Sequence, residues 1–176
     1  MNNEPNEFST SFTRRVLSLV NDRQNRGRAA ALRRGLSSQT KHYAYPVVLS
    51  LGGRLTKDGY PNPVDLTVAA LIATHPMNRE DGGNFGRVCK QLREGHESFD
   101  ARFRRLLACE RRKDACDHLR GFVLAAKQKS IKIDYARLHT DLTNWHWESV
   151  RLQWAETYWG AERGEAEILT EAESEA

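Results

Sequence analysis

The stretch Pro63-Val64-Asp65-Leu66-Thr67-Val68-Ala69-Ala70-Leu71-Ile72 is the most apolar of the chain. Proline suits the first position of a helix, because its missing N–H is one that a helix leaves unpaired there anyway. His75-Pro76 then ends the helical pattern. A helix this apolar is expected to be central to the first half of the protein, with other elements packed around it.

Segments on both sides of this stretch repeat apolar residues every three or four positions, which is the spacing of one helix face. Residues 46–51 fit either a helix or a short strand, and a helix is favoured because nothing nearby would pair with a strand. The pattern therefore predicts an all-α fold of about eight helices in two packed helical bundles, with no significant sheet. The flanking segments are 9–21, 26–35, 46–51, 85–92, 98–107, 115–126, 134–142 and 146–159.

Glu94-Gly95-His96 interrupts the helical pattern and is the expected domain boundary. We expect an N-terminal helical bundle over residues 8–94 and a C-terminal helical bundle over residues 97–160. Six glutamates against Arg163 give residues 161–176 a net charge of −5, which predicts an acidic, disordered tail. The whole chain carries +4, so this tail leaves +9 on residues 1–160. A body this basic favours a polyanionic partner, either nucleic acid or an anionic membrane.

The basic character is densest in the stretch Arg26-Gly27-Arg28-Ala29-Ala30-Ala31-Leu32-Arg33-Arg34-Gly35, which contains no acid. At 100° per residue, Arg26 and Arg33 fall almost on one line, while Ala29, Leu32 and Leu36 take the opposite face. This predicts a short helix, ended by Gly35, with a docked apolar side and an outward guanidinium row. Two interpretations fit this row of arginines equally well: contact with backbone phosphates, and a solvent-exposed helix face with no ligand.

Further basic positions lie on other predicted helices. Arg102 and Arg105 form an i, i+3 pair, and Lys113, Arg120 and Lys127 follow one line at a spacing of seven. Asp117 lies between Lys113 and Arg120, so part of that line fits internal pairing as well. Basic lines in both halves favour one continuous track for a phosphate backbone.

The sequence contains no recognisable active site. Gly82-Gly83-Asn84-Phe85-Gly86 follows no strand and lacks the lysine of a glycine-rich phosphate loop. No Cys/His set has zinc-site spacing, and the carboxylates occur singly, which fits helix caps and salt bridges. We therefore expect no catalytic residues, no metal, no cofactor and no small-molecule substrate.

Apolar runs, cysteines and recognition motifs indicate the cellular setting and the mode of binding. No apolar run approaches the roughly 20 residues that span a bilayer, so no membrane partner is expected. Cys89, Cys109 and Cys116 are an odd number with no close pair, which is typical of small buried or half-buried thiols in a reducing cytoplasm. No helix-turn-helix, zinc finger or RNA-recognition motif is present, which predicts backbone contact without base specificity.

A series of short motifs runs through the chain in a fixed order. Residues 28–34 contain an Ala-Leu-Arg-Arg element. The C-terminal third carries the elements Arg102-Phe103-Arg104-Arg105-Leu106-Leu107, His118-Leu119-Arg120, Ile133-Asp134-Tyr135, Leu138, Asp141-Leu142, Trp145, Val150-Arg151 and Trp154-Ala155-Glu156-Thr157-Tyr158-Trp159. Taken together, these motifs resemble the CasB family, the small subunit of the type I-E CRISPR surveillance complex, Cascade, and residues 28–34 resemble the N-terminal motif of that family.

The resemblance implies an all-α, non-enzymatic protein that is present as two copies in the complex and stabilises the R-loop. The implied partners are the CRISPR RNA and target DNA backbone, other Cascade subunits and a second copy of the chain. Asp134, Asp141, Trp145 and Trp154 match the family pattern and are interpreted as packing and capping residues. By motif, the implied nucleic-acid-binding residues are Arg28, Arg33, Arg34, Arg102, Arg105 and Arg120; the charge pattern alone adds Arg26, Lys41 and Lys127.

Two other hypotheses remain open at this point. A free-standing, non-specific nucleic-acid-binding protein would bind DNA or RNA tightly without partner subunits. A helical adaptor would instead use the basic face to bind acidic protein surfaces, and would bind polynucleotides negligibly.

Overall fold

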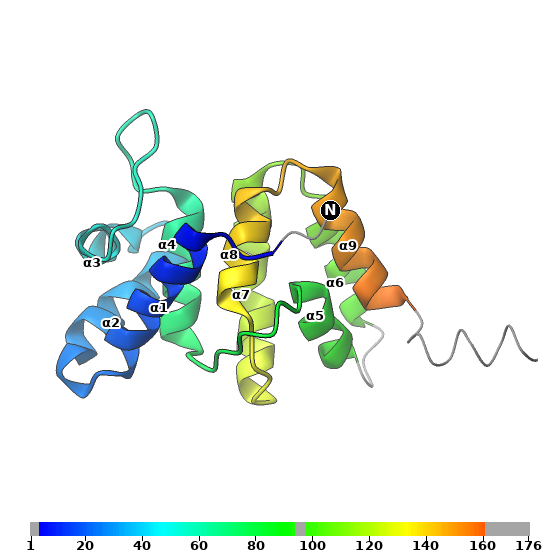
Figure 1. Ribbon diagram of the computed structural model, residues 1–176, viewed down its shortest axis with the longest axis horizontal. Coiled ribbons are helices and arrows are strands. Elements are labelled where there is room, and N and C mark those ends of the chain that lie inside the picture. Colours follow the sequence, from blue (N-terminus) through cyan, green and yellow to red (C-terminus); the bar gives the residue numbers. More distant parts are fainter. Residues whose placement is uncertain (1–3, 94–97, 161–176) are drawn as a thin grey trace, which may run out of the picture.

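The computed structural model describes residues 4–93 and 98–160 (Figure 1). Within these residues the protein is all-helical, as predicted, and two isolated bridges, Leu55 with Pro61 and Asn78 with Ile133, stand in place of a sheet. The α-helices are α1 Glu7–Asn21, α2 Arg26–Arg33, α3 Tyr45–Ser50, α4 Pro63–Thr74, α5 Phe85–Arg93, α6 Ser98–Leu107, α7 Arg112–Gln128, α8 Tyr135–Thr143 and α9 Glu148–Trp159. Three 3-10 turns are η1 Arg23–Asn25, η2 Arg34–Leu36 and η3 Lys41–Tyr43.

Side-chain caps satisfy free N–H groups in the first turns of α1, α4 and α8, and Asn6 is the cap of α1. Asn62 accepts a hydrogen bond from Val64 N just before Pro63, and Asp134 accepts one from Arg137 N at the start of α8. Such caps stabilise a helix by about 1 kcal/mol each. The predicted Pro63 start and the predicted Asp134 cap are therefore both confirmed.

The helices form two packed groups with α7 and α8 between them (Figure 1). On one side α1, α2 and α3 pack with α4, and on the other side α5 packs against α9 and α6. The central α8 is buried along residues 135–142 and contacts both α1 and α4. This position explains why α8 carries so many buried polar groups, because each of its faces meets another element.

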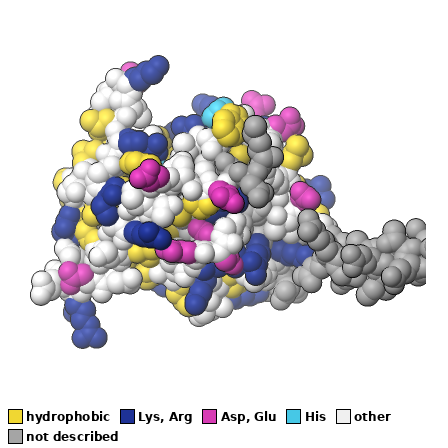
Figure 2. Space-filling model, viewed as in Figure 1, with side chains coloured by type: hydrophobic (Ala, Val, Ile, Leu, Met, Phe, Trp, Pro, Cys, Tyr) yellow, Lys and Arg dark blue, Asp and Glu magenta, His cyan; other side chains and the backbone are white. Residues whose placement is uncertain are grey.

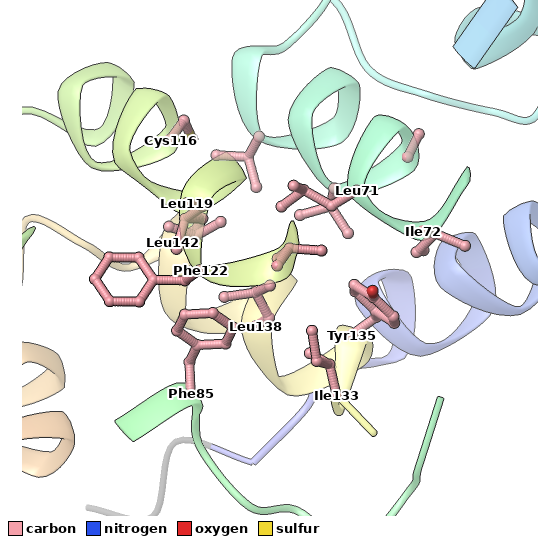
Figure 3. Packing of buried hydrophobic residues seen from close by; sticks show 14 of the residues in the cluster. Leu71, Ile72, Phe85, Cys116, Leu119, Phe122, Ile133, Tyr135, Leu138 and Leu142 are labelled. Carbon is pink, nitrogen blue, oxygen red and sulfur yellow. The ribbon is translucent and has the colours of Figure 1, made fainter. Parts of the chain in front are cut away.

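Both groups contribute to one continuous hydrophobic core. Leu71 and Ile72 of α4 point toward the same interior as side chains from α7 and α8, and Phe85 of α5 reaches it from the other group (Figure 3). Trp145 and Trp154 are fully buried, and their rings meet edge to face with centroids 5.0 Å apart. Burial of such aromatic pairs adds stability beyond their apolar area.

The predicted division into units 8–94 and 97–160 stays a prediction. Its boundary at residues 94–96 and the predicted tail over residues 161–176 lie outside the described residues. Contacts of α5 with α9 and of α1 with α8 cross the boundary.

The prediction that Gly35 ends the arginine-rich helix was wrong, because α2 already ends at Arg33. Gly35 lies inside the η2 turn, where a Cβ would come within 3.2–3.3 Å of Ala70, Ala44 and Leu66, so it permits close packing against α4. Asn84 Nδ2 donates to Gln153 O and Thr157 Oγ1, whereas its Oδ1 has no hydrogen-bond partner among the described residues and does not cap α5. Trp147 precedes α9 and is 49% exposed, outside the core stripe of that helix.

Candidate nucleic-acid interface

The helix α2 presents its arginines to solvent because its other face is docked. Ala29 and Leu32 are buried, which confirms the predicted inward face. The arginines of the stretch, Arg26, Arg28, Arg33 and Arg34, are exposed. Within the described part of the chain, none of the four forms an ion pair with a carboxylate. Their positive charges are thus not neutralised by described residues.

Neutral contacts fix the direction of three of these side chains. Arg28 Nη2 donates to Ser50 Oγ at 2.6 Å, and Arg33 Nη1 donates to the carbonyl of Ala73 at 3.3 Å. The guanidinium of Arg34 lies 4.6 Å from the centroid of the Tyr43 ring, a cation–π contact. These contacts orient the guanidinium groups without cancelling their charge.

Arg33 and Arg34 meet Arg120 of α7 at one surface hollow of about 470 Å³. We call it the arginine hollow, and it is lined by Ala30, Arg33, Arg34, Leu36, Ser37, Thr40, Thr74, Arg120 and Leu124. None of these described lining residues is a carboxylate. By contrast, the face drawn in Figure 2 carries cations and carboxylates side by side. Residues far apart in the chain therefore create one local site of positive charge.

Lys41 lies in a neighbouring groove that shares Leu36 with the arginine hollow. Lys113 of α7 lines the same groove, but so do Asp58 and Asp117. The two lysines there face two carboxylates, so this groove is less suited to a polyanion than the arginine hollow.

The remaining predicted residues do not line the arginine hollow. Arg102 is half-buried, with its guanidinium 4.9 Å from the Phe99 ring centroid and 5.1 Å from that of Phe122, so much of it is packed. Arg105 is exposed beside a depression that Glu110 and Asp114 also line.

Lys127 is exposed in the last turn of α7. It lies seven residues, or about 10 Å along the helix axis, beyond Arg120. It therefore extends the basic line of that helix away from the hollow.

A buried polar network that the sequence did not reveal ties α1, α4 and α8 together. Ser9 Oγ lies 2.7 Å from His139 Nδ1, and His139 Nε2 lies 2.9 Å from Asp65 Oδ1. All three side chains are fully buried, and the rings of Phe8 and Phe12 pack against the imidazole. No short motif signals this network, because Ser9 and His139 are 130 positions apart.

The order serine–histidine–aspartate resembles that of a hydrolase triad, but the ring nitrogens are exchanged. In such triads Nε2 faces the serine, whereas here Nδ1 does. Ser9 also has no solvent exposure through which a substrate would reach it. The network is therefore a structural tie between helices.

Protonation states follow from the same contacts. Burial alone would raise the pKa of Asp65, but hydrogen bonds from His139 and Arg54 outweigh it and lower that pKa to about 2. Burial lowers the pKa of His139, although the hydrogen bond with Asp65 opposes this change. Arg54 Nη2 donates to Asp65 Oδ1 at 2.7 Å, so it balances the carboxylate charge while the imidazole stays neutral.

The residues interpreted as packing and capping have those roles. Asp141 accepts from Arg137 Nε at 2.9 Å and from Trp154 Nε1 at 2.7 Å, all in the interior. Trp145 is buried and donates to the carbonyl of Cys109 at 2.7 Å. These contacts join α8 to α9 and to the segment that follows α6.

Neither a cluster of metal-binding side chains nor a membrane-spanning helix is found in the described residues. They contain no group of three or more His, Cys, Asp or Glu side chains arranged to hold a metal ion. None of the helices in residues 4–93 and 98–160 is long and apolar enough to cross a bilayer.

The fold and surface together define a helical protein in which arginines from distant parts of the chain meet at one hollow. The model of the family "CRISPR-associated protein Cse2" matches residues 28–159. The chain therefore belongs to the Cse2 family, also called CasB, of the type I-E Cascade complex.

Two solved structures from Thermus thermophilus are similar to this chain. One is a CRISPR-associated protein of the Cse2 family, with 26% identity and a TM-score of 0.71. The other is a structure of CasB, with 25% identity and a TM-score of 0.68. In both cases the match covers 87% of this chain and 98% of the other. No match was found among curated proteins.

Proposed function

We propose that this chain is a non-catalytic small subunit of a CRISPR RNA-guided surveillance complex, and that it stabilises the R-loop by contacting nucleic-acid backbone. Guide–target pairing supplies sequence specificity in such complexes, and R-loop formation is a near-balanced exchange of base pairs. A few phosphate contacts are therefore enough to shift the balance.

The observation that carries this proposal is the arginine hollow. Arg33, Arg34 and Arg120 line it, and none of its other described lining residues is a carboxylate. A guanidinium offers a planar fork of donors that suits phosphate oxygens. These side chains lie on helices and turns rather than on base-reading motifs, which favours backbone contact of any sequence.

Membership of the Cse2 family favours this function over the two alternatives. A free-standing nucleic-acid-binding protein would bind polynucleotide tightly in isolation, whereas a subunit acts mainly beside its partners. An adaptor for acidic protein surfaces would use the same arginines but would leave R-loop stability unchanged. One reconstitution, with the isolated chain measured alongside, therefore separates all three.

The test compares R-loop lifetime in a reconstituted complex that lacks this chain, contains it, or contains the Arg33→Ala/Arg34→Ala/Arg120→Ala variant. We expect the variant to shorten the lifetime by about tenfold or more, since three exposed contacts of about 0.5–1 kcal/mol each sum to at least one decade.

The matched control replaces three cations that do not line the hollow, Arg14, Lys57 and Arg87, by alanine. It removes the same charge and should retain most of the lifetime. Equal losses in both triple variants would mean that net charge, and not the arginine hollow, supports the R-loop.

A further inference from the structure

A second basic pocket lies at the C-terminal end of α7. It has a volume of about 570 Å³ and is lined by Arg79, Gln91, Lys129, Ser130, Ile131 and Lys132; we call it the Arg79 pocket. It shares none of these residues with the arginine hollow. No carboxylate is among its described lining residues, and Lys129 and Lys132 are exposed at its rim.

The backbone holds Arg79 firmly beside this turn. Arg79 N donates to the carbonyl of Ile133 at 3.1 Å, and Ile133 N donates to that of Met77 at 3.0 Å, which forms a short parallel bridge. Gly83 makes room for the guanidinium, because a Cβ there would lie 2.7 Å from Arg79 Nη2. The segment before α5 is thus built around this side chain.

The guanidinium of Arg79 has unused hydrogen-bonding capacity. Its side chain is only 15% exposed, and its buried Nε and Nη2 lack a hydrogen-bond partner within the described part of the chain. Asp81 Oδ1 lies 3.2 Å from Nε, but without hydrogen-bond geometry, and Arg87 binds the other oxygen of that carboxylate. Arg79 is therefore ion-paired with Asp81 but short of hydrogen bonds. Because its Nε and Nη2 are buried, a phosphate in the pocket would meet the exposed part of this side chain.

The turn at Ser130 brings a further hydrogen-bonding residue to the Arg79 pocket. Ile131 N donates to Ala126 O and Ser130 N to Lys127 O, which is the pattern that ends a helix with one left-handed residue. Glycine usually occupies that position, yet here Ser130 does, with a φ of 53°. A serine costs conformational energy there but places a hydroxyl-bearing residue in the pocket wall.

We propose that the Arg79 pocket binds a phosphate group. Arg79, Lys129 and Lys132 supply the positive charge, and Ser130 and Gln91 supply neutral hydrogen bonds. A free phosphate and a phosphodiester of a polynucleotide share this chemistry. The assignment to a polynucleotide rests on the proposed function, whereas phosphate binding itself does not.

The test titrates the full chain, labelled with ¹⁵N, with inorganic phosphate and follows the backbone amide shifts. We expect saturable shifts at Arg79, Ser130 and Lys132. The Lys129→Gln/Lys132→Gln variant should raise the apparent Kd by roughly tenfold, because charge-assisted hydrogen bonds are lost. The direct variant, Arg79→Gln, changes a largely buried side chain and can fail to fold. The double lysine variant keeps the test decisive in that case, because both lysines are exposed.

The control is Lys57→Gln, an exposed lysine in the loop before α4, which should match the wild type. Unsaturable shifts, or an unchanged Kd in the double lysine variant, would overturn the proposal. In a second arm, single-stranded DNA replaces phosphate. Competition at the same amides supports a backbone phosphate, and binding of phosphate alone supports a small-anion pocket while counting against the polynucleotide assignment.

Discussion

His139 is held as a neutral imidazole by the residues around it. Ser9 donates its hydroxyl hydrogen to Nδ1, Asp65 accepts from Nε2, and two phenyl rings exclude water. Burial lowers the pKa of His139 in the folded protein. In the unfolded chain the same residue titrates near its ordinary value of about 6.5.

This difference predicts an acid-sensitive fold. Above about pH 6.5 the imidazole is neutral in both states, so its contribution to stability is fully present. As the pH falls below that value, His139 becomes protonated in the unfolded chain but stays neutral in the folded protein. The unfolding free energy therefore declines until the pH passes the lower pKa of the folded state. Urea unfolding measured at about pH 7.5 and about pH 5.5 checks this decline.

The matched control for this prediction is another histidine. His118 is exposed, so His118→Gln should keep the wild-type pH dependence, whereas His139→Gln should flatten it. The same slope in wild type and His139→Gln would contradict the assigned role. Asp65 adds a second loss only below this window, as the pH falls from the ordinary aspartate value of about 3.9 toward its folded pKa of about 2.

At the scale of helices, α5 and α9 approach so closely that one glycine decides their packing. A Cβ at Gly86 would collide with the backbone carbonyl of Trp154. The side chain of Phe85 also lies against the Trp154 ring, with centroids 5.4 Å apart. The two helices therefore meet backbone to backbone at Gly86 and ring to ring at Phe85.

Replacement of Gly86 by alanine should destabilise the protein by about 1–3 kcal/mol, because α9 must move to admit the methyl group. Gly27 offers a matched control, since it is also helical and a Cβ added there would meet nothing within 4 Å. Gly27→Ala should instead raise stability by up to about 1 kcal/mol. Urea unfolding of both variants tests this, and a Gly86→Ala protein as stable as wild type would refute the close approach.

At the scale of the whole molecule, the all-α fold followed from local signals. Apolar spacing, Pro63 and the Asp134 cap depend on neighbours in the chain, so they are readable without coordinates. Gly35 was misread because its role is set by Ala44 and Ala70, which lie next to it only in the folded protein. The same limit hid the contact of Ser9 with His139.

The candidate site also combines features that local sequence predicts with features that only tertiary packing creates. Exposure of Arg33 and Arg34 followed from the periodicity of α2, but their meeting with Arg120 depends on how α7 packs. Arg102 matched the same motif-based expectation, yet it lies over two phenyl rings. Arg79 carried no sequence signal, because its role depends on a bridge to Ile133 and on the empty space at Gly83.

The charge distribution leads to one decisive measurement, the salt dependence of target binding by the reconstituted complex. If Arg33, Arg34 and Arg120 each neutralise one phosphate of a single strand, their replacement by alanine should make the slope of log Kobs against log salt shallower by about 2, alike for all target sequences. An unchanged slope, or a loss of affinity that follows the target sequence, would contradict backbone contact at the arginine hollow.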